Sequence, residues 1–99
     1  MDLGLEGKVA VITGGSRGIG KGISQRLAAE GSDLLLVSAT EANLKKTQDE
    51  ISSNTNRRVE ICPADMSDPA SADAVHKAAT DAYGRVDILV NSAGVAVGG

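Results

Sequence analysis

The chain has 99 residues, a formal net charge of −3 and a sequence pI near 5.0, so it has room for one small domain, and its charge argues against a nucleic-acid-binding surface. Its single cysteine, Cys62, excludes an intrachain disulfide, and no apolar segment approaches the length that spans a membrane. No secretory signal follows Met1, so we expect a cytoplasmic protein that binds neither nucleic acid nor a membrane.

The first predicted strand, Lys8–Thr13, is a continuous apolar run, which is typical of a parallel strand covered on both faces. The turn Thr13–Gly20 follows it and leads into a helix predicted over Gly18–Glu30. Glycines allow the backbone to turn sharply and to approach a ligand, and the free amide groups of a helix start attract an anion. This stretch therefore predicts a phosphate-binding corner.

The rest of the chain alternates strands and helices. In the first helix Ile19, Ile23 and Leu27 recur at helical spacing and predict an apolar face, and Ala28 and Ala29 allow close packing. Asp68 is a predicted N-cap, with Pro69 at the first helical position. The elements predicted after the first helix are a strand over Asp33–Val37, a helix from about Glu41 to Ser52, a strand over Val59–Pro63, a helix from Pro69 to about Tyr83 and a strand over Val86–Val90.

This alternation predicts an α/β fold, a doubly wound parallel sheet of which the chain holds the first four strands and three helices. Ligands of such sheets bind beyond the carboxyl ends of the strands. Four segments follow strand ends and are expected to converge on one cleft: Thr13–Gly20, Ser38–Thr40, Ala64–Met66 and Asn91–Gly94.

Three known patterns fit the glycine turn unequally. The dinucleotide fingerprint GxGxxG does not fit in register. The Walker A pattern GxxxxGK[ST] fits from Gly15 to Lys21, but Gly22 stands where a Ser or Thr would hold magnesium. A turn that only connects a strand to a helix is the alternative without a ligand. A further pattern, TGxxxGxG, fits completely at Thr13, Gly14, Gly18 and Gly20.

The segment TGGSRGIG at residues 13–20 resembles the cofactor motif of the short-chain dehydrogenase/reductase family. Ala64-Asp65-Met66 is similar to the acidic segment after that family's third strand, and Asn91-Ser92-Ala93-Gly94 resembles its NNAG motif, with Ser92 in place of the second Asn. Within that family, the overall sequence resembles the 3-oxoacyl-carrier-protein reductases. The resemblance implies a Rossmann-like fold, with residues 1–99 as the N-terminal part of one dinucleotide-binding domain.

The resemblance also implies roles for individual residues. The glycines would shape the turn around the cofactor pyrophosphate, and Ile19 would lend its backbone amide. Asp65 and Met66 would border the adenine, with the Asp65 carboxylate accepting from the exocyclic amine; a turn-forming carboxylate is the alternative reading. Asn91 would tie the strand end together. The predicted cofactor-binding residues are Gly14, Ser16, Arg17, Gly18, Ile19, Gly20, Ser38, Thr40, Asp65, Met66, Asn91, Ala93 and Gly94.

The end of the second strand bears on the choice of nicotinamide cofactor. An acid there would bind the ribose hydroxyls of NAD and repel a 2′-phosphate, but the strand is followed by Ser38, Ala39 and Thr40. Arg17 stands where NADP-preferring members of the family often carry a basic residue, and a guanidinium can bind a phosphate in a fork. Ala39 is an observation against NADP, because many such members have a second Arg at this place. The absence of an acid and the presence of Arg17 nevertheless favour the phosphorylated cofactor, so we predict NADP(H) over NAD(H).

The residues that carry the family's chemistry are absent from the chain. The family uses a Tyr and a Lys spaced YxxxK, whereas Asp87 stands four residues after the single tyrosine, Tyr83. No cluster of Cys and His predicts a metal site. We therefore predict no catalytic residue and no metal ligand, and we expect the chain alone to be inactive as the N-terminal half of a longer enzyme.

Two functions remain open at the level of the sequence. The first is an NADP(H)-dependent oxidoreductase that interconverts a small-molecule carbonyl and an alcohol by hydride transfer, present here as its cofactor-binding half. Resemblance implies a homodimer or homotetramer for the full-length protein. The alternative is a non-catalytic NADP(H)-binding or scaffold module. A Ser followed by YxxxK beyond Gly99 in the reading frame would favour the oxidoreductase.

Overall fold

The computed structural model describes residues 4–14 and 18–91. Their strands and helices alternate in the predicted order, and the strands form one parallel sheet in the order β3-β2-β1-β4. The predicted Rossmann-like arrangement of four strands and three helices is therefore confirmed. The elements are β1 Val9–Thr13, α1 Gly18–Ala29, β2 Asp33–Ser38, α2 Glu41–Thr55, β3 Val59–Pro63, α3 Ser71–Tyr83 and β4 Ile88–Asn91.

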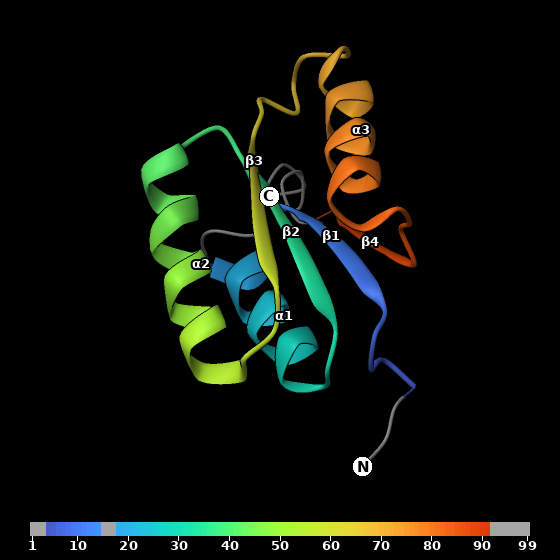
Figure 1. The fold of residues 1–99 in the computed structure, drawn as a ribbon. Coiled ribbons are helices and arrows are strands. Elements are labelled where there is room, and N and C mark those ends of the chain that lie inside the picture. The colour runs from blue at the N-terminus through green and yellow to red at the C-terminus, as the bar shows by residue number, and fades with distance from the viewer. Residues whose placement is uncertain (1–3, 15–17, 92–99) are drawn as a thin grey trace.

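Helices cover both faces of the sheet, with α1 and α2 on one side and α3 on the other (Figure 1). The order of the strands explains this division. The chain moves outward from β1 to β2 to β3 and then crosses back past β1 to β4. Because crossovers between parallel strands are right-handed, the reversal places α3 on the opposite face. The sheet therefore carries a hydrophobic core on each side.

The continuous apolar run of β1 is explained by this double cover. All five residues of β1 are buried. Ala10 and Ile12 belong to the core under α1 and α2, whereas Val11 belongs to the core under α3 together with Val75 and Ala79. Successive residues of a strand face opposite sides of a sheet, so a strand covered on both sides is apolar throughout.

The face of α1 that carries Ile19, Ile23 and Leu27 is only partly buried, whereas the close packing predicted at Ala28 is confirmed. Ile19 is 67% exposed, and the buried residues of the helix are Gly20, Ser24 and Ala28. These side chains are small, which lets the helix axis approach the sheet closely. The Ser24 hydroxyl donates to the Gly20 carbonyl at 2.7 Å, so its burial leaves no polar group without a partner. The larger residue Leu27 is partly buried at the border of the core.

The other two helices differ from prediction at their ends. Helix α2 continues to Thr55, and Asn56, at φ 56°, ends it in the left-handed region. The Thr55 hydroxyl donates to the Ile51 carbonyl at 2.7 Å. Helix α3 begins at Ser71 rather than at Pro69. Asp68 accepts from the Ala70 amide at 3.0 Å through its side chain and from the Ser71 amide at 2.9 Å through its carbonyl, which forms a separate turn before the helix.

The single tyrosine lies at the amino ends of the strands, opposite the edge where ligands of such sheets bind. The Tyr83 hydroxyl is 2.6 Å from the Leu34 carbonyl and 3.0 Å from the Arg58 carbonyl, and the Arg58 guanidinium carbon lies 4.8 Å from its ring centre. Burial raises the pKa of Tyr83, with a smaller contribution from Glu60. Tyr83 therefore supports the fold, which agrees with the absence of a lysine four residues after it.

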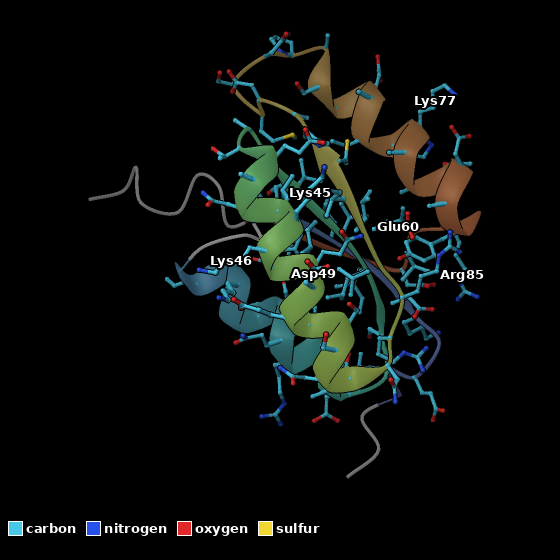
Figure 2. All side chains as sticks on the ribbon, turned by 60° about the vertical axis from the view of Figure 1, so that its left-hand side comes forward. Lys45, Lys46, Asp49, Glu60, Lys77 and Arg85 are labelled. Carbon is cyan, nitrogen blue, oxygen red and sulfur yellow. The ribbon has the colours of Figure 1, made fainter. Side chains whose placement is uncertain are left out.

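Charged side chains are distributed over the outer surfaces of several elements. Figure 2 shows Lys45, Lys46 and Asp49 along α2 and Lys77 on α3. Lys77 forms an ion pair of 3.0 Å with Asp81, one helical turn away. No helix in residues 4–14 and 18–91 is long and apolar enough to cross a membrane. Within the same residues, no group of three or more His, Cys, Asp and Glu side chains is arranged to hold a metal ion.

Candidate functional site

The carboxyl ends of the strands are joined by backbone hydrogen bonds at one edge of the sheet. The Gly14 amide donates to the Val37 carbonyl at 2.7 Å and connects the glycine turn to the end of β2. The Ala64 amide donates to the Ser38 carbonyl at 2.9 Å and connects the segment after β3 to the same strand. The predicted convergence of these segments is therefore present in the described residues.

A side-chain hydrogen bond joins the ends of β1 and β4. The Thr13 hydroxyl lies 3.0 Å from Asn91 Oδ1 and 3.3 Å from the Val90 carbonyl, and Thr13 is 3% exposed. The threonine of TGxxxGxG thus holds the side chain of the first residue of the NNAG-like segment. In the sequence Thr13 was recognised only as part of the TGxxxGxG motif. Its role in linking the two strands depends on the parallel register that places Thr13 beside Asn91.

The glycine turn uses a backbone conformation that other residues rarely adopt. Gly14 and Gly18 have φ angles of 74° and 55°, in the left-handed region. A Cβ atom at Gly18 would meet nothing within 4 Å, so the requirement for glycine there is conformational rather than steric. Helix α1 begins at Gly18 and has no acidic residue in its first turn, so no carboxylate of that turn competes with an anion for its positive end.

Asp65, which follows β3, is held by hydrogen bonds from its own loop. Its Oδ1 accepts from the Ser67 amide at 2.9 Å and from the Ser67 hydroxyl at 2.7 Å, and these bonds hold the pKa of the carboxyl below its usual range. Its carbonyl accepts from the Ser71 hydroxyl at 2.6 Å and the Asp68 amide at 3.0 Å. The turn-forming role is therefore present. Within the described residues both side-chain hydrogen bonds of Asp65 use Oδ1, so Oδ2 can accept from a ligand. Sequence reasoning missed Ser67 and Ser71.

A groove of about 220 Å³ lies between α3 and strands β1 and β4. It connects the strand ends to an apolar wall on which Leu89 is 69% and Met66 37% exposed. Common ligand pockets measure roughly 300–1,000 Å³, so this groove can hold only part of a ligand. The lining residues are Val11, Thr13, Met66, Ala72, Val75, His76, Val86, Leu89 and Asn91.

The turn after β2 contains no acidic side chain. Ser38 is half-buried and its hydroxyl accepts from the Thr40 amide at 3.3 Å, while Ala39 and Thr40 are exposed. Thr40 stands at the N-cap of α2 without a capping hydrogen bond from its side chain, so its hydroxyl is not used for capping. The first acidic residue after the strand is Glu41, which begins α2 and is exposed.

The structure brings most of the predicted cofactor residues to this edge. Gly14, Gly18 and Gly20 lie between β1 and α1, and Asp65 and Asn91 lie after β3 and at the end of β4. The others placed by the structure are Ile19, exposed in the first turn of α1, together with Ser38, Thr40 and Met66. Four predicted residues lie outside the described part of the chain: Ser16, Arg17, Ala93 and Gly94.

The known proteins that this chain resembles are members of one family of oxidoreductases. A family model described as "short chain dehydrogenase" matches residues 8–99. The chain is 41% identical over 93 residues to 3-oxoacyl-[acyl-carrier-protein] reductase FabG of Vibrio cholerae, covering 94% of this chain and 36% of the relative. Oxidoreductase UcpA of Escherichia coli is 43% identical over 91 residues, covering 92% of this chain and 34% of the relative.

The fold is also similar to that of solved structures. L-sorbose reductase from Gluconobacter frateurii, complexed with NADPH and L-sorbose, superimposes with a TM-score of 0.87 at 37% identity, covering 90% of this chain and 34% of that one. The chain spans about a third of the length of the relatives it matches. With the family model matching nearly all its residues, the chain belongs to the short-chain dehydrogenase family of oxidoreductases.

Proposed function

We propose that the protein is an NADP(H)-dependent oxidoreductase that interconverts a small-molecule carbonyl and an alcohol, with residues 1–99 as part of its dinucleotide-binding domain. One observation carries the proposal. The glycine turn, with Gly14 in the left-handed region, and the start of α1 lie at the edge where the ends of the parallel strands are bonded together. Ligands of doubly wound sheets bind at such an edge, and phosphate groups bind at helix starts of this kind.

The described residues suit a dinucleotide. The amide groups at the start of α1 can bind the pyrophosphate, and Asp65 offers a carboxylate oxygen to the adenine amine. Asn91, held by Thr13, would lie beside the nicotinamide half. The cofactor, when bound, supplies or accepts the hydride. The role of these residues is then to bind and orient the cofactor at the strand ends.

The NADP(H) preference is supported by the turn after β2. Residues 38–40 bring no carboxylate to the place where NAD-binding proteins hold the ribose hydroxyls, and Arg17 would bind the 2′-phosphate. L-sorbose reductase was solved with NADPH, whereas the Burkholderia phymatum short-chain dehydrogenase, with a TM-score of 0.82, was solved with NAD. The intact protein would act in the cytoplasm as a homodimer or homotetramer.

A second candidate function is a non-catalytic NADP(H)-binding module. It requires only the cofactor-binding residues described above. Tyr83, the single tyrosine of residues 1–99, has its hydroxyl 2.6 Å from the Leu34 carbonyl at the opposite end of the sheet. Tyr83 therefore cannot serve as the acid or base of hydride transfer at the strand ends. Oxidation of NADPH by a carbonyl substrate in the intact protein would exclude this alternative.

Cofactor titration tests the proposal. The intact protein is expected to bind NADPH at least about tenfold more tightly than NADH, because a guanidinium–phosphate pair contributes about 1.5 to 3 kcal/mol. Arg17→Ala should remove this difference by weakening NADPH alone. Arg26→Ala, an exposed arginine of α1 paired with Glu30, is the matched control and should leave both affinities unchanged. Tighter binding of NADH by the unsubstituted protein would contradict the proposal.

A further inference from the structure

The loop after β3 holds Asp65 by several hydrogen bonds, although water could satisfy an exposed carboxylate without them. Two donors of one residue, the amide and the hydroxyl of Ser67, bind Oδ1 at 2.9 Å and 2.7 Å. The carbonyl of the same aspartate accepts from the Ser71 hydroxyl at 2.6 Å. Asp65 is therefore fixed both at its backbone and at its side chain, although it is exposed to solvent.

These contacts give the two carboxylate oxygens different roles. Oδ1 is occupied by both donors of Ser67, and all the side-chain hydrogen bonds of Asp65 within the described residues end on that atom. A carboxylate can accept several hydrogen bonds on each oxygen, so Oδ2 keeps its capacity for an outside donor. The Ser67 bonds also lower the pKa of the Asp65 carboxyl, which keeps it ionised and an acceptor only.

The surroundings of Asp65 suit a flat heterocycle that carries an amine. Met66, the next residue, is 37% exposed and lines the apolar groove together with Thr13 and Asn91 from the other strand ends. An apolar ring face would lie against Met66, and the carboxylate of Asp65, the preceding residue, would accept from an amine on that ring. In a bound dinucleotide, the adenine has this combination of an apolar face and an exocyclic amine that donates.

We propose that Ser67 is a positioning residue for cofactor binding, which holds Oδ1 of Asp65 so that Oδ2 is presented to the exocyclic amine of the adenine. This inference rests on the proposed function. Fixing an exposed side chain before binding reduces the conformational entropy that binding would otherwise cost. Ser67 therefore contributes to the recognition of adenine without contacting the cofactor.

The test compares NADPH with its hypoxanthine analogue, in which a carbonyl oxygen replaces the exocyclic amine. With the intact protein, NADPH should bind about tenfold more tightly than the analogue, because the amine donates to a carboxylate and the carbonyl cannot. Ser67→Ala should reduce that preference about fivefold, chiefly by weakening NADPH binding. Ser67→Thr, which keeps the hydroxyl, should restore the preference. Ser53→Ala, an exposed position on α2, is the matched control and should leave it unchanged.

A purely structural role of Ser67 predicts a different result. It would weaken NADPH and the analogue equally and leave their ratio unchanged, and that outcome overturns the inference. If Ser67→Ala does not fold, Ser67→Gly, which also lacks the hydroxyl, replaces it: reduction of the preference supports the inference and an intact preference overturns it. Failure of the unsubstituted protein to bind NADPH would instead overturn the proposed function, and the inference with it.

Discussion

Replacement of Ala39 by aspartate is expected to reverse the cofactor preference of the intact protein. Ala39 is exposed in the turn after β2, and the neighbouring Thr40 amide is bonded to the Ser38 hydroxyl, so the turn can accept a larger side chain without repacking. The new carboxylate would repel the 2′-phosphate of NADPH and accept from the ribose hydroxyls of NADH. We expect the ratio of the two affinities to change about 100-fold, equivalent to about 2.7 kcal/mol.

Titration of Ala39→Asp with both cofactors measures this change, and Ala39→Asn is the matched control. Asparagine has nearly the size of aspartate but no charge, so it should change the ratio far less. An aspartate variant that still prefers NADPH by the original ratio would show that this turn does not border the ribose. That result would move the 2′-phosphate site away from residues 38–40.

Leu36→Ala is expected to destabilise the fold by about 3 kcal/mol, within the range of about 2 to 5 kcal/mol that such truncations cost in a packed core. Leu36 lies in β2, between β3 and β1, and is 0% exposed. It packs in the core under α1 and α2 with Ala28, Leu44 and Ile51. Removal of its side chain would leave a cavity where the sheet and two helices meet, and the surrounding backbone cannot close it completely.

Urea unfolding of the intact protein measures the loss, and Lys45→Ala is the control. Lys45 is also shortened to alanine, but it is exposed on the outer surface of α2 and lies outside the core. It should cost no more than about 0.5 kcal/mol. Equal losses for the two variants would contradict the placement of the core on the α1 and α2 side of the sheet.

The layers of the fold follow from features that a sequence displays directly. The apolar runs of β1 and β2 indicated parallel strands covered on both sides, and both strands are buried. Of the buried residues of α1, only Ala28 was predicted to pack closely, because large apolar side chains were the main signal. In this helix the residues nearest the sheet are small, Gly20, Ser24 and Ala28, and closeness of packing outweighs the hydrophobicity of Ile19.

The candidate site was predicted in outline but not in its supporting contacts. Gly14, Asp65 and Asn91 were predicted because their spacing from predicted strands resembles known motifs. Thr13 and Ser67 were missed as supporting residues because their roles arise from geometry: one hydroxyl reaches across to β4, and the other turns back on a carboxylate two residues earlier. Arg17 lies outside the described residues, so its contact with a 2′-phosphate stays a prediction.

Mapping of amide chemical shifts in the ¹⁵N-labelled intact protein on titration with NADPH is the most direct test of a cofactor site at the carboxyl ends of the strands. The largest changes are expected at Gly14, Gly18, Asp65 and Asn91, which follow β1, begin α1, follow β3 and end β4. Saturable changes centred on Tyr83 and the amino ends of the strands, with these four amides unaffected, would contradict the account.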